Sequence, residues 1–418
     1  MKRWRLLERL SGTDGNIAVI FAIALPAVIG VTGMSVESGY WYQKERQLQQ
    51  AADAGAFAGA TVLRDQSGSV EAAAYDEIGK FGFSGSNATI GINTPPSSGP
   101  NQNARSVEVT ISFPARRFFS AVFSSDPVIV NARAVATFAE PTNACLLALD
   151  TAASGAVTFR GGSLVSVSKC EIMSNSIADD AAILTGGPSV TTPCINTVGD
   201  ISISNNSNLT LTECAAARTN QQRAKDPYAD RLPPETSGAC DNLPPVTGGP
   251  GTSYTYDAGP TGVRRICSNV GLKRNHHFEP GVYILDGADL SINAGANVTG
   301  SGVTFYMTDG ARVQMNGNAT VELSAPTTGN FAGIAFWGDV ANTTTTHIIN
   351  GTASSSITGA IYAPGSIVSF NGNFSGIGGC MQLVARMIDF AGNASISTDC
   401  SGFGLEWAGV PGRVQVVE

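Results

Sequence analysis

Charged side chains are scarce in this chain of 418 residues. They make up 14% of it, against roughly 25% in an average soluble protein, whereas hydrophobic residues make up 43%. This balance excludes a coiled coil, a helical bundle and a generally disordered chain. The 48 glycines instead favour many short strands joined by tight turns. With 25 basic against 33 acidic residues, the net charge is −8, so we expect no nucleic-acid partner.

Patterns that carry chemistry are also lacking. The chain has three histidines, and the adjacent His276 and His277 lack the spacing of metal ligands. Neither they nor His347 are accompanied by a Gly-x-Ser-x-Gly nucleophile motif, and no glycine-rich phosphate loop ends in Gly-Lys-Ser/Thr. We therefore expect no catalytic residue, no metal site and no cofactor, and a protein that is not an enzyme.

Cysteine is absent from the first third of the chain. All eight cysteines come later, at Cys145, Cys170, Cys194, Cys214, Cys240, Cys267, Cys380 and Cys400. Residues 1–140 also hold 12 basic and 12 acidic side chains, so the remainder, with 13 and 21, carries the whole net charge. The two regions therefore look like different modules.

One long uncharged run stands near the N-terminus, at residues 16–36. A helix of this length is about 31 Å long, enough to cross the hydrocarbon core of a bilayer. Basic residues dominate residues 1–15, which predicts a cytoplasmic tail by the positive-inside rule and places the rest outside the cytoplasm. Cysteines in such an oxidising space imply disulfides rather than a metal cluster. A cleaved signal peptide is the alternative, although its apolar region would be shorter, roughly 7–15 residues.

Residues 37–140 read as a small α+β module. The composition of residues 37–63 predicts a helix that continues the membrane span, and residues 69–81 a second, shorter helix. Apolar and polar residues alternate over 106–113 and 127–138, as in strands of an antiparallel sheet. Small residues also recur on one face of the first helix, at Ala51, Gly55 and Gly59. They favour close packing within the module, with an oligomer contact as the alternative.

These residues carry a resemblance. The run GNIAVIFAIALPAVIGVTGMSVESGYWYQKERQLQQAADAGAFAGA, with the later VEVTISFPARRFFSAVF and VNARAVATFA, resembles TadG-like proteins of the Flp (tight adherence) pilus-assembly system. The resemblance implies a bacterial inner-membrane protein with a pilin-like module outside the membrane, and other Flp/Tad assembly proteins as partners. Processed pilin relatives carry Glu at the fifth position after the cleavage-site glycine. Here the fifth position is Ile20 after Gly15 and Ile17 after Gly12. Because neither is Glu, we expect no cleavage by the prepilin peptidase and a retained anchor.

Residues 141–418 repeat a short pattern of two apolar residues at i and i+2, an Asn- or Gly-rich turn and further alternation. Copies start at Val157, Ile201, Leu290, Val313, Val368 and Ile388. The starts at Leu290 and Val313 are 23 residues apart and those at Val368 and Ile388 are 20 apart, about one turn of a parallel β-helix. The gaps of 44 and 55 residues between other starts fit about two turns, or turns with insertions. We therefore expect a mainly-β module, a β-solenoid, with a β-sandwich as the alternative. Residues 215–262 are rich in proline and predict a long loop or insertion.

The cysteine spacing fits this picture. Cys194 and Cys214 are 20 residues apart, as are Cys380 and Cys400, and neighbouring solenoid strands lie about 4.8 Å apart, within the range for a disulfide. Cys240 would then pair with Cys267 across the proline-rich loop, which leaves Cys145 with Cys170. Eight cysteines allow 105 pairings, so other schemes stay open.

The resemblance extends into this region. Segments such as LALDTAASGAVTFRGG, DPYADRLPP and GAIYAPGSIV resemble the C-terminal region of TadG-related proteins of alphaproteobacteria. Other TadG-like proteins carry a von Willebrand A-type domain with a metal site of Asp-x-Ser-x-Ser pattern. This chain has Asp150 and Ser154 but Ala152 between them, so that site is not carried over.

Three functions compete at this point. The first is a non-enzymatic envelope protein that helps to assemble or anchor a Flp-type pilus, which the resemblance implies. The second is a cell-wall or glycan-binding protein that uses the solenoid surface. Tyr254, Tyr256, Trp337 and Trp407 are its candidate contact residues, although packing in the core or in a turn is the more common role for each. The third, least favoured, is an enzyme whose carboxylates Asp286, Asp289 and Asp309 meet on stacked coils, as glycoside hydrolysis would need.

Overall fold

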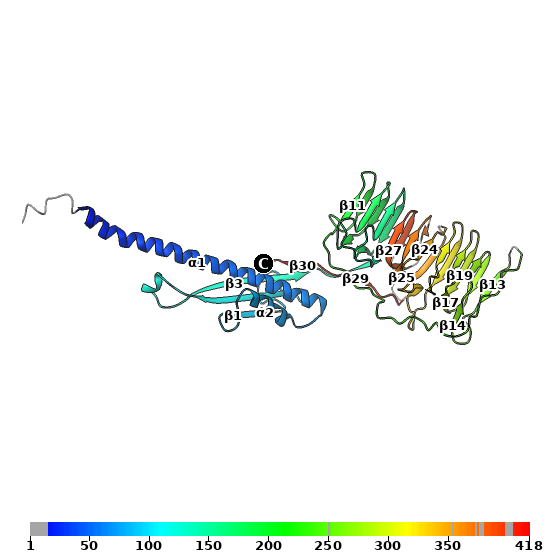
Figure 1. Cartoon of the computed structure of the whole chain (residues 1–418), viewed down its shortest axis with the longest axis horizontal. Coiled ribbons are helices and arrows are strands. Elements are labelled where there is room, and N and C mark those ends of the chain that lie inside the picture. Colours follow the sequence, from blue (N-terminus) through cyan, green and yellow to red (C-terminus); the bar gives the residue numbers. More distant parts are fainter. Residues whose placement is uncertain (1–15, 250, 353, 373, 376–379, 398–403) are drawn as a thin grey trace, which may run out of the picture. The chain divides into compact units, whose positions relative to one another are not determined.

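The computed structural model describes residues 16–249, 251–352, 354–372, 374–375, 380–397 and 404–418. It divides the chain into two compact units (Figure 1). Unit 1 comprises residues 1–139 and 412–418, and unit 2 comprises residues 140–411. The sequence had assigned residues 141–418 to a single β-module, whereas the last segment of the chain returns to unit 1. Unit 2 is therefore an insertion within unit 1.

A single helix, α1 (Asn16–Asp65), contains both the predicted span and the helix predicted after it. Its first half is apolar and exposed, with Val19 to Val36 showing large apolar side chains to the outside. By length and composition, this half could cross a membrane. Its second half is buried on one side, where Leu48, Ala52 and Ala56 are fully covered.

The sheet of unit 1 covers that second half of α1. Its antiparallel strand order is β1-β2-β3-β30. The strands are β1 (Thr89–Asn93), β2 (Ser106–Ala115), β3 (Val128–Phe138) and β30 (Val414–Val416), and a short helix, η3 (Ser120–Val122), lies between β2 and β3. The predicted helices and the antiparallel sheet are confirmed, but the sequence did not reveal β1 or β30.

Helix α2 (Val70–Lys80) packs on α1 at the small residues noted in the sequence. The Ser69 side chain accepts a hydrogen bond from Ala72 N–H and caps the helix, which explains why it begins there. A Cβ added at Gly55 would fall 2.8 Å from Ile78, and one at Gly59 would fall 3.1 Å from Val107. The small-residue face therefore serves packing within the module.

Unit 2 is a parallel β-solenoid with three faces, and the β-sandwich alternative is wrong because its stacked strands are parallel. The first face contains β4 (Thr142–Ala148), β7 (Glu171–Ser174), β10 (Ile195–Thr197), β14 (Val263–Ile266), β17 (Gly281–Asp286), β20 (Val303–Thr308) and β23 (Ile334–Gly338). The second contains β5 (Val157–Arg160), β8 (Ala182–Thr185), β11 (Ile201–Ile203), β15 (Val270–Leu272), β18 (Leu290–Ile292), β21 (Val313–Met315) and β24 (Thr346–Ile349).

The third face consists of two sheets. One contains β6 (Leu164–Ser168), β9 (Ser189–Thr192), β12 (Asn208–Leu211), β26 (Phe374–Ser375) and β28 (Ala394–Ser397), and the other β13 (Ser253–Tyr256), β16 (Asn275–Phe278), β19 (Asn297–Ser301) and β22 (Thr320–Ser324). Two long strands, β25 (Ser356–Phe370) and β27 (Met381–Phe390), run from one face to the next. A short strand, β29 (Ala408–Val410), pairs antiparallel with β4.

The repeat spacing read from the sequence matches the strand register. Leu290 pairs with Val313, and Val368 pairs with Ile388, as their separations of 23 and 20 residues predicted. Val157 pairs with Ala182, which in turn pairs with Ile201, so the gap of 44 residues spans two coils. These pairings stack the apolar residues of successive coils into one continuous core.

The coils do not stack in chain order. Strand β27 lies between β25 on one side and β4 and β5 on the other, so the last coil packs on the first. The chain enters unit 2 in the middle of the stack, winds to the β10–β12 end and then crosses to the β13–β15 end, from which it winds back to the middle (Figure 1). The order is that of a circularly permuted solenoid.

The crossing segment between β12 and β13 corresponds to most of the predicted insertion, residues 215–262. That prediction was wrong at its end, because β13 is a regular strand that stacks on β16. The segment also packs on the first face. Tyr228 is fully buried there and donates a hydrogen bond to Gln382 Oε1 at 2.6 Å. The segment is therefore a strap along the solenoid rather than a free loop.

Candidate functional site

A buried, fully hydrogen-bonded carboxylate of unit 1 lies where the apolar half of α1 ends. Glu37 is the first charged residue after the span, and its side chain is only 1% exposed. Its carboxylate accepts hydrogen bonds from the N–H groups of Phe118 (2.7 Å) and Ser120 (2.8 Å) and from Ser120 Oγ (2.9 Å). A buried carboxylate needs such partners, because burial without them is costly. Glu37 therefore fixes the loop 116–127 to α1.

The electrostatics of this contact favour the charged form of Glu37. Burial raises the pKa of the carboxyl group, but the hydrogen bonds from Phe118 and Ser120 and the nearby Arg117 guanidinium outweigh it, so the pKa lies below its ordinary value of 4.5. Arg117 also donates to Ser120 Oγ at 3.1 Å and stacks over the Trp41 ring at 5.7 Å. The carboxylate of Glu37 on α1 and the guanidinium of Arg117 on the loop therefore both hold the loop against the helix.

Aromatic contacts complete the attachment of the loop. Trp41 Nε1 donates to the Arg116 carbonyl at 3.3 Å, and the Tyr40 and Phe118 rings meet edge to face at 5.2 Å. From the sequence, Tyr40 and Trp41 stand just past the uncharged run, where a membrane-interface aromatic belt would lie, and Glu37 carries no predicted role. The signal available was its position, as the lone acidic residue directly after an uncharged helical segment.

Among the described residues, three disulfides join cysteines of unit 2. They are Cys145–Cys170, Cys194–Cys214 and Cys240–Cys267, with Cα–Cα distances of 5.6, 5.4 and 5.7 Å. These are pairs of the sequential scheme. Its fourth pair, Cys380 with Cys400, falls on a residue outside the described ranges. The disulfides fit a domain that stands outside the cytoplasm.

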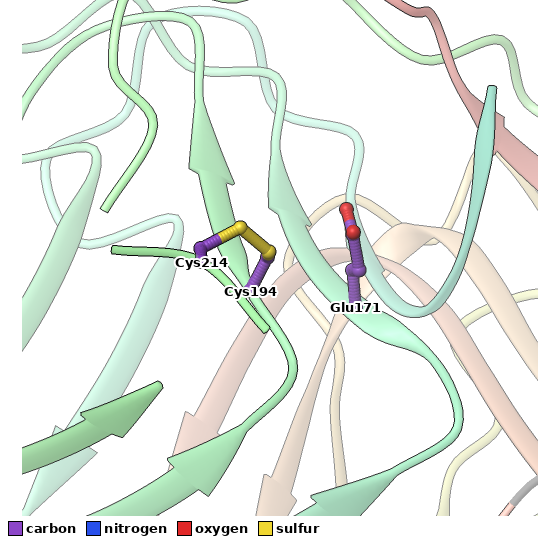
Figure 2. A group of neighbouring side chains, drawn as sticks. All are labelled: Glu171, Cys194 and Cys214. Atoms are coloured by element: carbon purple, nitrogen blue, oxygen red, sulfur yellow. A yellow bond between two sulfur atoms is a disulfide. The ribbon is translucent and has the colours of Figure 1, made fainter. Parts of the chain in front are cut away.

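One of these disulfides lies beside a buried carboxylate. Ligand atoms of Glu171, Cys194 and Cys214 lie within 4.8 Å of one another, as a metal site would require (Figure 2). Both sulfur atoms are consumed by the disulfide, so they are not thiolate ligands. Glu171 instead accepts hydrogen bonds from Thr142 Oγ1 at 2.7 Å and Asn196 Nδ2 at 2.6 Å. The cluster is a structural brace.

The three histidines have separate structural roles. His276 and His277 are neighbours on β16, so their side chains point to opposite faces of the strand, one buried and one exposed. His276 lies between the Tyr256 hydroxyl (3.1 Å) and the Lys273 N–H (3.1 Å). His347, on β24, accepts a hydrogen bond from Val313 N–H, and burial lowers its pKa to about 4. The three imidazole rings therefore do not converge on one site.

Two of the three acidic residues considered for catalysis are engaged in ion pairs. Asp286 pairs with Arg265, and Asp289 pairs with Arg312 at 2.8 Å. Asp309 lies in a turn with a positive φ of 51°. Asp150 accepts hydrogen bonds from two backbone N–H groups after it and pairs with Arg386 at 3.2 Å. Each arrangement stabilises a turn or a coil stack.

Two of the four aromatic residues named for glycan binding are buried. Tyr256 is 2% exposed and Trp337 is 4% exposed, so neither offers a ring to a ligand. Tyr254 is half-buried and stacks on the His276 ring at 5.2 Å. Trp407 is 37% exposed. The rings therefore do not form the exposed platform that the glycan-binding hypothesis needs.

Comparison with known proteins agrees with the geometry of α1. No curated protein and no solved structure matches the chain. Residues 15–62 match the family model Tad, of TadE/G-like Flp pilus-assembly proteins. This match begins with the exposed apolar half of α1 and ends within its packed half. The chain therefore carries a TadE/G-like Flp pilus-assembly domain at residues 15–62.

Proposed function

We propose that this chain is a single-pass protein of the bacterial inner membrane that assists the assembly or anchoring of a Flp/Tad-type pilus. Its N-terminus would be cytoplasmic and its bulk periplasmic. The observation that carries the proposal is the match of residues 15–62 to the TadE/G-like family, over a helix with one apolar, exposed half and one half packed against a sheet.

The role proposed is non-enzymatic. Supporting this, two of the histidines, His276 and His347, and two of the carboxylates considered for catalysis, Asp286 and Asp289, have structural partners within the solenoid. The solenoid would serve as a rigid spacer, because stacked parallel strands and disulfides resist bending. Unit 1 would supply the contact with the pilus machinery, since it contains the family segment.

Crosslinking in intact cells, followed by mass spectrometry, tests this proposal. We expect recovery of Flp secretion-machine or pilin-like proteins, with crosslinks in residues 37–139. A matched chain in which residues 140–411 are replaced by a short linker should keep these crosslinks. Recovery of peptidoglycan or wall-bound proteins alone, through residues 140–411, would contradict the pilus role and favour a wall-binding protein.

A further inference from the structure

Large apolar side chains crowd the outer surface of the loop 116–127. Val122 is 86% exposed and Phe123 is 84% exposed, while Phe118 and Phe119 remain about half exposed. Single exposed apolar residues are ordinary on soluble proteins, but four within six residues form a patch of the kind that marks an interaction site.

The loop lies beside the last turn of the predicted span. A Cβ added at Gly33 would fall 2.6 Å from the Phe119 ring, so this ring covers the helix there. Glu37, one turn further along α1, holds the backbone of Phe118 and Ser120. Gly33 lies three residues inside the span, about 4.5 Å from its end. The loop therefore reaches a depth at which α1 is still within the bilayer.

The helix surface around this contact has the same character. Val31, Met34 and Val36 are 68%, 56% and 62% exposed. If α1 crosses a membrane, lipid covers these side chains, and the same lipid layer meets the loop beside them. The occupant favoured by this continuity is therefore lipid rather than a protein partner.

Charge and aromatic placement fit a bilayer interface. Arg116 is exposed at the base of the loop and Arg117 lies over Trp41, where guanidinium groups can meet lipid phosphates. Tyr42 is 62% exposed on the following turn of α1, the level at which interface aromatics gather. The apolar tip thus lies at the level of the acyl chains, and the arginines and aromatic residues lie at the level of the headgroups.

We propose that residues 118–123 insert into the outer interface of the bilayer that α1 enters, with Phe119, Val122 and Phe123 against the acyl chains. Unit 1 would then be held at two points, the helix and the loop, which fixes its orientation on the membrane. This placement rests on the membrane anchor proposed above.

The test uses the full chain in phosphatidylcholine vesicles, with and without phosphatidylglycerol. An environment-sensitive fluorescent amino acid replaces one residue at a time, which leaves the disulfides intact. The positions are Phe123 in the loop, Val28 in the span and Tyr75 on α2 as an exposed control (45% exposed). Nitroxide-labelled lipid and aqueous iodide serve as quenchers. We expect Phe123 to emit at shorter wavelength than Tyr75 and to be quenched several-fold more by the lipid nitroxide.

The possible failures are distinguishable. Quenching by lipid at Val28 but not at Phe123 would overturn the loop insertion and leave the anchor standing. No lipid quenching at either position would overturn the anchor and the insertion with it. Protection of Phe123 from iodide without quenching by lipid would show that protein, rather than the bilayer, covers the loop. Arg116→Gln should reduce quenching at Phe123 in the anionic vesicles only.

Discussion

Phe159 stacks on Phe390, with ring centroids 5.3 Å apart and planes within 7° of parallel. Phe390 stacks in turn on Phe370 at 5.1 Å. Phe370 and Phe390 belong to successive coils, but Phe159 belongs to the first coil of unit 2, far back in the chain. This contact closes the permuted stack, because it joins the beginning of the solenoid sequence to its end.

Truncation of either ring tests this junction. Phe159→Ala and Phe390→Ala should each lower the free energy of unfolding of unit 2 by about 3–5 kcal/mol, since each leaves a cavity in the core. The double variant should lose less than the sum, because both changes remove the same contact. Chemical denaturation followed by circular dichroism measures this. Leu164→Ala, at an exposed site, is the control. Strict additivity would argue against the stacked junction.

Removal of residues 412–418 tests whether the C-terminus belongs to unit 1. The deletion eliminates β30 and the ion pair of Glu418 with Arg133 on β3. We expect limited proteolysis to cut within residues 37–139 much faster, while residues 140–411 stay resistant. Glu406→Gln is the control, because its ion pair with Arg231 is exposed on the Glu406 side and worth little. Unchanged cleavage of unit 1 would show that β30 is dispensable.

Acid should weaken unit 1 through Glu108. Burial raises the pKa of this carboxyl group, but hydrogen bonds from Ser97, Asn93 and Arg133 outweigh it and lower the pKa to about 2. A depressed pKa contributes stability that is complete above the ordinary value of 4.5 and is lost as the pH falls towards about 2. Glu108→Gln should be less stable than wild type at neutral pH and should flatten this part of the pH profile. If the free energy of unfolding of unit 1 fell equally in the two proteins between pH 4.5 and about 2, Glu108 would not be the source of the acid sensitivity.

The attachment of the loop 116–127 should depend on Glu37. Glu37→Gln exchanges a carboxylate acceptor for a neutral amide, so hydrogen exchange at the Phe118 and Ser120 amides should accelerate. Because the pKa of Glu37 is lowered, the wild-type loop should loosen as the pH falls below about 4.5, and the variant should respond less. Glu45→Gln, exposed on α1, is the control. Equal exchange in both variants would remove Glu37 from this role.

The Cys194–Cys214 disulfide braces one end of the solenoid. Replacing both cysteines by serine releases a loop with a sequence separation of 20 residues, which should lower the free energy of unfolding of unit 2 by about 3 kcal/mol. Thermal unfolding compared with wild type measures the loss. A reducing agent, which also cleaves the other disulfides, should lower the melting temperature of wild type at least as far as that of the variant. A variant as stable as oxidised wild type would show that the brace is not needed.

Much of the local structure was predictable because it depends on residues close in the chain. The second helix near residues 69–81, the alternation in β2 and β3 and the spacing of Leu290 and Val313 depend on residues within one element or in adjacent coils. Packing was the favoured role for Trp337 and Tyr256, and their burial confirms it. What covers these rings was not predictable, because alternation assigns a residue to a face but does not reveal what packs on that face. The strap over the first face supplies part of that cover.

The sequence by itself determined the apolar helix, the small α+β module and the parallel coils, since hydrophobic period and turn residues act locally. Tertiary structure decided which edges meet. The exposed edge strand of any parallel coil offers the same backbone groups for pairing, so the sequence of one strand does not select its neighbour. The contacts of the whole folded unit select β4 as the neighbour of β27. The same holds for β30, which completes the sheet of unit 1 from the far end of the chain. Glu37 gains its role in the same way, because its partners lie more than 80 residues away.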